Sequence, residues 1–317
     1  MVKEVPKLIE EVENEVSKVV VGQKRTVRSI MRAILCNGHV LVEGVPGIAK
    51  TLVVRAVARV LGCNMNRVQF TVDLLPTDLT GIQTYTPEKG FETLKGPIFA
   101  NFILADEVNR APPKTQSALL EAMQEKSVTI AKETFKLKEP FFVMATENPI
   151  ESSGVYNLPE AQVDRFIFKI VMGYPSFEEE VNIMDQNITI HHFHEFKLRE
   201  ILDADKILSL QELTKKVFSS DAIKEYIVNL VEETRNKNAE YSRFIEYGAS
   251  PRASIALYIA SKAEALMNGR DHVIPDDVKE VVFDVLRHRI ILSYEAQAEK
   301  INSDKIIEEI LKTVNAP

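Results

Sequence analysis

Residues 44–51 form the segment whose residue types and spacing best suit phosphate binding. They read GVPGIAKT, and they lie between the apolar run HVLVE and the helical run LVVRAVARVLG. A phosphate-binding loop needs Gly, four residues, Gly, Lys and then Ser or Thr, between a strand and a helix. Gly44, Gly47, Lys50 and Thr51 suit such a loop, whereas Ala49 stands where the pattern has its second Gly. An alanine costs little there if its φ is negative, so this departure weakens the match without removing it.

The predicted loop would bind a nucleotide through its backbone and two side chains. Backbone N–H groups aimed inward, with a helix N-terminus behind them, form a cradle for phosphate groups. Lys50 would reach the β- and γ-phosphates, and the Thr51 hydroxyl would bind Mg²⁺. The nucleotide contacts predicted in the loop are Gly44, Val45, Pro46, Gly47, Ile48, Ala49, Lys50 and Thr51. The alternative is a plain glycine turn between a strand and a helix.

Polar groups follow two further apolar runs. Residues 101–107 read NFILADE, about 55 residues after Lys50. Asp106 suits an acid that holds Mg²⁺, and Glu107 could orient and deprotonate an attacking water. Asn148 follows the run FFVMATE, and its amide could position that water against the γ-phosphate. Taken alone, an acidic pair at a strand end is common by chance, and Asn before Pro is usually a turn.

These groups meet only if their strands belong to one parallel sheet. Short apolar runs alternate with helical stretches up to about residue 172, which is the pattern of a parallel α/β sheet. The candidate strands are residues 39–43, 67–71, 101–105, 141–146 and 166–171. Ligands of such sheets bind beyond the carboxyl ends of the strands. Lys50, Asp106 and Asn148 would lie at that edge, and Arg165 would lie at the opposite edge.

The remainder of the chain shows helical spacing of apolar residues. The predicted helices are residues 177–186, 205–218, 221–234, 250–268, 275–289 and 304–314. Ser220 and Ser250 have the character of helix starts. We therefore expect an α/β domain with a five-stranded parallel sheet over residues 1–172. A linker with the first lid helix would follow over 173–203, and a helical domain over 204–317.

Composition and charge narrow the classes of function. The chain has 317 residues, of which 45% are hydrophobic and 27% charged, as in ordinary globular proteins. Its 39 Lys and Arg against 46 Asp and Glu give a net charge of −7, which argues against non-specific nucleic-acid binding. No apolar run approaches the length of a membrane span. Two cysteines, Cys36 and Cys63, form no disulfide framework and indicate a reducing cytoplasm.

The order of these motifs resembles that of the MoxR family of AAA+ ATPases, in their helix-2-insert branch. The segments that carry the resemblance are GVPGIAKT, FILADEVNRAPPKTQSALLEAMQE, FVMATENP, LPEAQVDRF and GASPRASIAL. The resemblance extends from about residue 19 to 309. It implies a P-loop AAA+ core with a helical lid, ATP and Mg²⁺ as cofactors, and assembly into a ring that is a hexamer. Members of this family carry an Ala before the lysine of the loop, as Ala49 does here.

The resemblance also assigns roles that the spacing alone does not. Val21, Gly22 and Gln23 match the family's segment near the adenine, and Arg165 matches the arginine finger that completes the neighbouring subunit's site. Arg252 matches the sensor-2 arginine of the lid. Both arginines suit the charge that develops on a transferred phosphoryl group. Without the resemblance, Arg165 would be interpreted as an ion-pair partner of Asp164 or Glu160. Arg110 is a further candidate for the interface.

Two segments resemble the inserts of this branch. Residues 72–98 contain Gly81, Gly90 and Gly96 with alternating apolar residues, and residues 127–138 read as a hairpin with its turn near Lys132–Glu133. In this branch such hairpins can line the pore of the ring and touch the substrate, and plain surface hairpins are the alternative. His191, His192 and His194 fit no strong zinc pattern, and a solvated connection is the preferred interpretation.

The leading interpretation is an ATP-driven ring that remodels or matures a protein client, often with a von Willebrand factor A domain partner. A nucleic-acid motor and the ATPase subunit of a metal chelatase are alternatives from related families. A static nucleotide-dependent scaffold is a fourth alternative, which the intact Glu107 disfavours.

Overall fold

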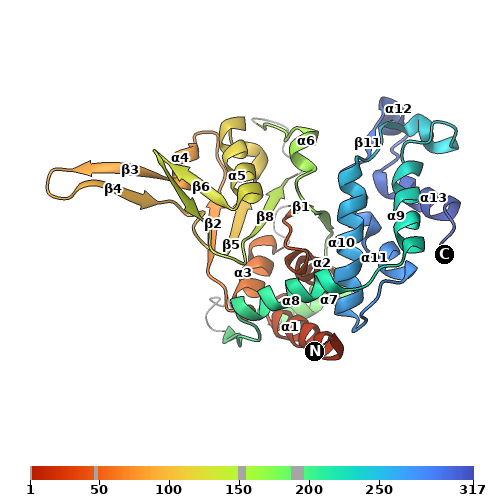
Figure 1. Ribbon diagram of the computed structural model, residues 1–317, viewed down its shortest axis with the longest axis horizontal. Helices are drawn as coiled ribbons and strands as arrows, with labels where there is room; N and C mark the ends of the chain where they lie inside the picture. The colour runs from red at the N-terminus through yellow and green to blue at the C-terminus, as the bar shows by residue number, and fades with distance from the viewer. Residues whose placement is uncertain (1, 46–48, 149–154, 187–195) are drawn as a thin grey trace.

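A five-stranded parallel sheet forms the centre of the protein. The computed structural model describes residues 2–45, 49–148, 155–186 and 196–317 (Figure 1). The sheet has the order β2-β5-β8-β1-β9. Its strands are β1 (Val40–Gly44), β2 (Met65–Gln69), β5 (Phe102–Asp106), β8 (Phe142–Glu147) and β9 (Phe168–Met172). The predicted fold class is confirmed, with strand bounds that shift by one or two residues from those expected.

Each central strand is apolar on both sides because helices cover both faces of the sheet. Val40 and Val42 pack into one hydrophobic cluster with α1 (Val5–Ser17), α2 (Lys24–Leu35) and α3 (Lys50–Val60). Leu41, between them, points to the other cluster, which contains α4 (Pro76–Thr80) and α5 (Pro113–Glu125). This alternation explains why the strands show near-continuous apolar runs rather than a polar and an apolar face.

Two hairpins extend from the core on the side away from the lid (Figure 1). Strands β3 (Gly81–Thr86) and β4 (Gly90–Lys95) pair antiparallel, as do β6 (Ser127–Ile130) and β7 (Glu133–Lys136). The predicted hairpins are therefore present. The second turn lies at Ala131–Lys132, one residue earlier than expected, because Ile130 pairs with Glu133 and Ala131 takes a φ of +54°.

The C-terminal part is helical, as predicted, with one short strand pair that the sequence did not indicate. Its helices are α7 (Phe177–Gln186), α8 (Ala204–Lys216), α9 (Asp221–Glu233), α10 (Pro251–Met267), α11 (Pro275–Leu286), α12 (Tyr294–Ala298) and α13 (Ser303–Thr313). Ser220 and Ser250 cap α9 and α10, since their hydroxyls accept hydrogen bonds from Ile223 N–H and Arg252 N–H. Strands β10 (Ile245–Tyr247) and β11 (Ile291–Leu292) pair antiparallel. The short elements η1 (Val2–Glu4), η2 (Val108–Arg110), α6 (Glu160–Val163) and η4 (Glu240–Phe244) complete the described structure.

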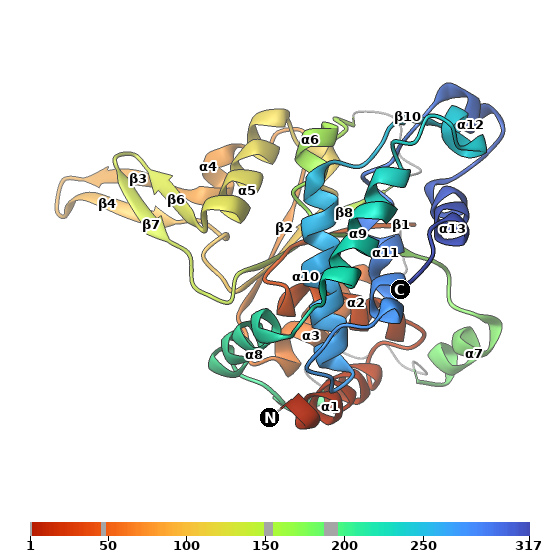
Figure 2. The same ribbon diagram turned by 45° about the vertical axis from the view of Figure 1, so that its right-hand side comes forward.

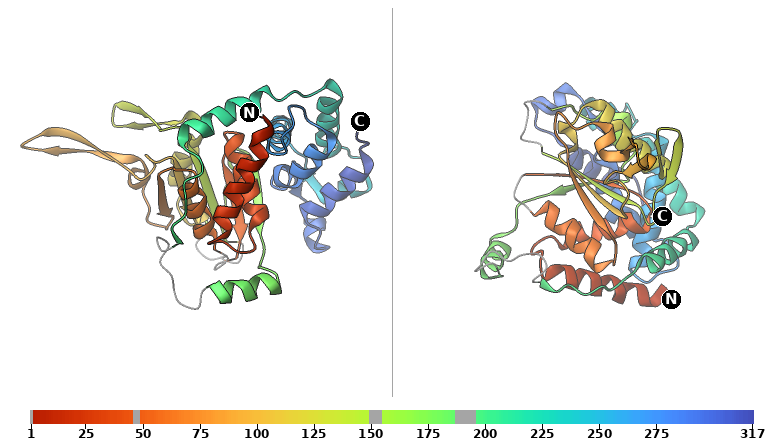
Figure 3. Two further views of the ribbon diagram at one scale, coloured as in Figure 1. Left: turned by 90° about the horizontal axis from the view of Figure 1, so that it is seen from below. Right: turned by 90° about the vertical axis from the view of Figure 1, so that its left-hand side faces the viewer.

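The lid packs directly on the core through α10, which runs beside α2 and α8 (Figure 2). Arg32 of α2 is buried, and its guanidinium pairs with the Glu264 carboxylate of α10 at 2.6 Å. A buried ion pair tolerates little displacement of its partners, so it fixes the register between the two helices. In contrast, α7 is set apart from the other lid helices (Figure 3).

Candidate functional site

The two ends of the predicted phosphate loop lie at the carboxyl edge of the sheet, as expected. Gly44 ends β1 and Lys50 begins α3, while Pro46, Gly47 and Ile48 lie outside the described residues. Lys50 Nζ donates a hydrogen bond of 2.8 Å to Gly44 O, which keeps the ammonium group beside the end of β1. The first N–H groups of α3 have no intrahelical partner, so the helix presents partial positive charge there.

Ala49 differs from expectation in its backbone conformation. Its φ is +62° and its ψ is 22°, in the left-handed region, whereas the sequence interpretation relied on a negative φ. A Cβ in this region costs on the order of 1 kcal/mol, which glycine avoids. The departure from the Gly pattern at this position therefore carries a small conformational cost at the start of α3.

Asp106 is buried between two polar partners from neighbouring strands. Its Oδ1 accepts a hydrogen bond of 2.7 Å from the Thr146 hydroxyl of β8. Its Oδ2 accepts two from the Arg67 guanidinium of β2, at 2.7 Å from Nη2 and 3.1 Å from Nε. Only 8% of Asp106 is exposed. Because buried carboxylates need charged or hydrogen-bonded partners, these contacts compensate the burial.

Glu107 leaves the end of β5 in a left-handed turn with a φ of +57°. Its backbone N–H donates to Thr146 Oγ1 at 2.9 Å, so the same hydroxyl orients both acids of the pair. Its Oε2 accepts hydrogen bonds from Gln69 Nε2 at 2.7 Å and from Arg110 Nη1 at 2.9 Å. The Glu107 carboxylate is thus held at the sheet edge, and Arg110 is its ion-pair partner within this chain.

The register of the sheet brings the remaining predicted groups to the same edge. Glu43 lies level with Glu147 across β1 and β8, so Gly44 lies level with the buried Asn148. The Thr51 hydroxyl and the Asp106 carboxylate are hard oxygen donors of the kind that Mg²⁺ prefers. The donor chemistry of these two residues therefore fits a magnesium ion. In the described structure, the Arg67 guanidinium is the cation that contacts the Asp106 carboxylate.

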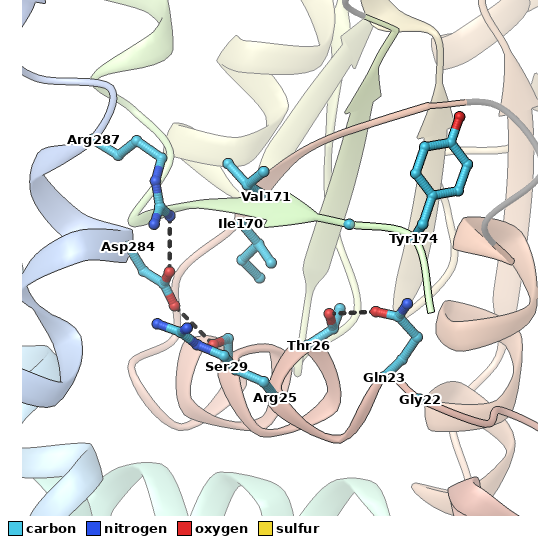
Figure 4. A pocket seen from close by; sticks show the side chains of 11 residues that line it. Gly22, Gln23, Arg25, Thr26, Ser29, Ile170, Val171, Tyr174, Asp284 and Arg287 are labelled. Atoms are coloured by element: carbon cyan, nitrogen blue, oxygen red, sulfur yellow. Dashed lines mark hydrogen bonds and ion pairs between the residues drawn. The ribbon is translucent and has the colours of Figure 1, made fainter. Parts of the chain in front are cut away.

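A polar pocket adjoins the predicted adenine segment (Figure 4). It lies between α2, the end of β9 and α11, and it has a volume of about 190 Å³. Gly22, Gln23 and Tyr174 line one side, and Asp284 and Arg287 line the other. Whole-ligand pockets usually have about 300–1,000 Å³, so this one can hold a part of a nucleotide rather than all of it.

Gly22 is the position in this segment where only glycine fits well. Its φ is +75°, and a Cβ there would lie 2.8 Å from the Glu179 carboxylate of α7. The positive φ is what requires glycine here, since the Glu179 carboxylate ends a flexible side chain that could move aside.

Arg165 lies at the opposite edge of the sheet, three residues before β9 begins. Its Nε is buried and has no hydrogen-bond partner among the described residues. Asp164, beside it, pairs instead with Arg289 Nε at 2.7 Å and with Arg252 Nη1 at 3.7 Å. The alternative that Arg165 serves as the ion-pair partner of Asp164 therefore finds no support in the structure.

Arg252 belongs to the same cluster, at the first turn of α10. The Asp164 carboxylate also accepts a hydrogen bond of 3.1 Å from the Ser250 hydroxyl, which caps that helix. Because β9 runs parallel to β1, Asp164 lies at the amino edge of the sheet and Gly44 at the carboxyl edge. Arg165 and Arg252 are thus grouped together, and both lie away from the phosphate loop of their own chain.

Several residues of the site were not singled out by the sequence analysis. Arg67, Gln69 and Thr146 contact the acidic pair, and Arg289 fixes Asp164. The one available signal was that Arg67 and Gln69 alternate along β2. Alternate side chains lie on the same face of the sheet, where they can contact side chains of the neighbouring strand.

Two further observations concern the rest of the chain. Among the described residues, no helix combines the length and the apolar character needed to cross a bilayer. Likewise, no group of three or more His, Cys, Asp or Glu within the described ranges could hold a metal ion. His191, His192 and His194 lie outside those ranges.

Comparisons with known proteins agree with this architecture. Residues 39–168 match the ATPase family associated with various cellular activities (AAA), and residues 239–310 match the AAA lid domain. These ranges fall within the predicted core and the predicted lid, whose boundaries themselves stay a prediction.

Individual relatives match almost the whole chain. Chaperone MoxR1 of Mycobacterium tuberculosis is 48% identical over 309 residues, which are 96% of this chain and 81% of the relative. The uncharacterised protein YeaC of Bacillus subtilis is 46% identical over 95% of this chain and 92% of its own length. A crystal structure from Cytophaga hutchinsonii, assigned as an ATPase, superposes with a TM-score of 0.90 at 48% identity, covering 99% of this chain and 96% of that one. The chain belongs to the MoxR family of AAA+ ATPases.

Proposed function

We propose that this protein hydrolyses ATP with Mg²⁺ in a ring of identical subunits, a hexamer, and uses the cycle to remodel or mature a protein client. The observation that carries the proposal is the convergence of Lys50, Asp106, Glu107 and Asn148 on one edge of a parallel sheet. A chaperone among its relatives supports a protein client. Cys36 and Cys63 are both free thiols, which is consistent with work in a reducing cytoplasm.

Each residue of the site has a defined part in the proposed reaction. Val45 and the remaining loop residues would hold the phosphates, with Lys50 on the β- and γ-phosphates, and Val21, Gly22 and Gln23 would adjoin the base. Thr51 and Asp106 would hold Mg²⁺, which supplies neutralisation of the phosphate charge. Glu107 would take the proton of the attacking water, and Asn148 would orient that water.

The arginine cluster at the amino edge would serve the neighbouring subunit. Arg165 and Arg252 lie around Asp164, away from the loop of their own chain. A ring can bring this edge of one subunit to the nucleotide of the next. Two guanidinium groups would then meet the charge that develops on the γ-phosphate.

The exposed hairpin suggests where a client would be bound. Tyr85 and Phe91 are 64% and 73% exposed, and they face each other across β3 and β4 with ring centroids 5.2 Å apart. Exposed aromatic pairs of this kind favour contact with another protein. A von Willebrand factor A domain protein is the partner that we propose to work with the ring.

The decisive experiment compares two variants of the purified protein. Glu107→Gln should bind Mg-ATP like the parent, since Lys50, Thr51 and Asp106 remain, but its turnover should fall by about 10²–10⁴. Lys50→Ala should lose nucleotide binding. Parental turnover by Glu107→Gln would remove the proposed base, and undiminished ATP binding by Lys50→Ala would remove the proposed phosphate site. Affinity capture with ATP-bound Glu107→Gln would then identify the client, because a stalled ring should retain it.

A further inference from the structure

The side chain of Arg67 lies on the carboxylate that the proposed function reserves for a metal. Arg67 extends from β2, an edge strand, and its side chain is 50% exposed. Its Nη2 and Nε both donate to the same oxygen, Asp106 Oδ2. The other oxygen of Asp106 accepts the Thr146 hydroxyl hydrogen bond. In the described structure, one carboxylate oxygen of Asp106 therefore contacts a neutral hydroxyl, and the other contacts a cation.

The Arg67 guanidinium and a metal ion would compete for Asp106 Oδ2. The Asp106 side chain is 11% exposed, so few directions of approach to Oδ2 are open. A guanidinium already at hydrogen-bond distance would repel a second positive charge beside it. Because Arg67 is half-exposed and extends from an edge strand, it has solvent into which it can withdraw. Asp106 has no such freedom, since it ends a central strand that is buried on both faces.

We propose that Arg67 is the internal cation of Asp106 while no metal is bound, and that it must leave this carboxylate for Mg²⁺ to bind there with the nucleotide. Arg67 thereby sets the concentration of Mg²⁺ that nucleotide binding requires. This inference rests on the proposed function, because it concerns the same carboxylate.

The contacts of Arg67 extend this effect to the proposed base. Its Nη2 also donates to Gln69 Oε1 at 2.7 Å, and Gln69 Nε2 in turn donates to Glu107 Oε2 at 2.7 Å. The hydrogen-bonded chain therefore runs from Asp106 through Arg67 and Gln69 to Glu107. When Arg67 leaves Asp106, Gln69 loses the donor that orients its amide. Whether Asp106 contacts Arg67 or a metal ion would thus affect the hydrogen bond that Gln69 donates to Glu107 in the same subunit.

The test is the Mg²⁺ dependence of nucleotide binding, measured without turnover. A fluorescent, non-hydrolysable ATP analogue is held at fixed concentration while Mg²⁺ is titrated, and the half-saturating Mg²⁺ concentration is determined. Arg67→Ala should lower that concentration about tenfold, because the competing cation is gone. A tenfold change corresponds to about 1.4 kcal/mol, the scale of a hydrogen bond to a charged group. Arg67→Gln also removes the charge but keeps an uncharged amide donor on a shorter side chain, and its decrease should be no larger than that of Arg67→Ala.

Arg59→Ala is the matched control. Arg59 lies on α3, is also about half-exposed, and pairs with Glu200 at 2.7 Å rather than with the acidic pair. Arg59→Ala also removes one positive charge, but away from Asp106. Its half-saturating Mg²⁺ concentration should therefore equal that of the parent. If both folded Arg67 variants need as much Mg²⁺ as the parent, or more, the inference is overturned while the proposed function stands. If the parent itself binds no analogue in the presence of Mg²⁺, the proposed function fails and the inference fails with it.

Discussion

Replacing Arg165 tests whether one subunit completes the active site of the next. The five residues of β9 span about 16 Å at roughly 3.3 Å per residue, and Arg165 lies three residues before them. Met172, at the far end of β9, is level with Gly44. Arg165 is therefore separated from the phosphate loop of its own chain by the length of the sheet. We expect Arg165→Ala to bind ATP almost normally but to lose about 10³–10⁵ in turnover, the range measured for arginines supplied in trans.

Mixing variants distinguishes a trans role from a structural one. Equal amounts of Arg165→Ala and Lys50→Ala, allowed to exchange subunits, form four kinds of interface at random. Only one of the four joins an intact Lys50 to an intact Arg165 from its neighbour. If interfaces act independently in a closed ring, the mixture should recover about a quarter of the parental turnover. Steady-state phosphate release measures it.

The control for this mixture uses the same chains with one further change. The double variant Lys50→Ala, Arg165→Ala is mixed with Arg165→Ala. No chain in this mixture has an intact Arg165, so it should recover no turnover. Subunit exchange is followed independently by fluorescence transfer between labelled chains. If the chains exchange and the first mixture stays as inactive as its components, the trans role is refuted. Arg165 would then act within its own chain.

Three further predictions concern stability. Arg32→Ala should lower the free energy of unfolding by about 3 kcal/mol, measured by urea denaturation. This is at the low end for a broken buried pair, because Arg28 still contacts Glu264. The control, Arg59→Ala at an exposed ion pair, should lower it by less than about 1 kcal/mol. His39 is buried between Met123 O and Val143 N–H, and burial lowers its pKa from 6.5 to about 4. The stability due to neutral His39 is complete above pH 6.5 and is lost as the pH falls towards 4. The parent should therefore lose about 2 kcal/mol more than His39→Gln between pH 7 and pH 5, and equal losses would contradict the buried neutral ring. Ala49→Gly should raise the free energy of unfolding by about 0.5 kcal/mol, because relief at φ +62° exceeds the entropy cost of glycine; a lower melting temperature would argue against the left-handed conformation.

The strands and most helices could be predicted because their signals are local. Strands β1, β5 and β8 are mostly apolar, and α9 and α10 begin with capping serines that identify their starts. In contrast, α12 has five residues and β11 has two. Such segments are too short for a period of 3.6 or 2 to appear. Their structure depends on neighbours, as when Ile245 pairs with Leu292, distant in the sequence.

The acidic pair was visible in the sequence, but its surroundings were not. Arg67 and Gln69 reach Asp106 and Glu107 only because β2 pairs with β5 in the register that sets Gln69 beside Asp106. Nothing local to either strand specifies that register. The left-handed φ of Ala49 was likewise hidden, since a single alanine carries no preference for it. Local patterns therefore located the candidate reacting groups, whereas strand order determined which partners hold them.

In the proposed ring, the arrangement of the two sheet edges would relate the lid of one subunit to catalysis in the next. Asp164 joins Arg252 at the start of α10 to Arg289, which follows α11, and it adjoins Arg165 of the core. At its other end α10 is fixed to the core by the Glu264–Arg32 pair. A rotation of the lid would therefore have to break a buried ion pair or move Arg252 relative to Arg165. Because either change would alter the edge that the proposed ring presents to the next nucleotide, we expect lid position in one subunit and hydrolysis in its neighbour to be coupled through α10.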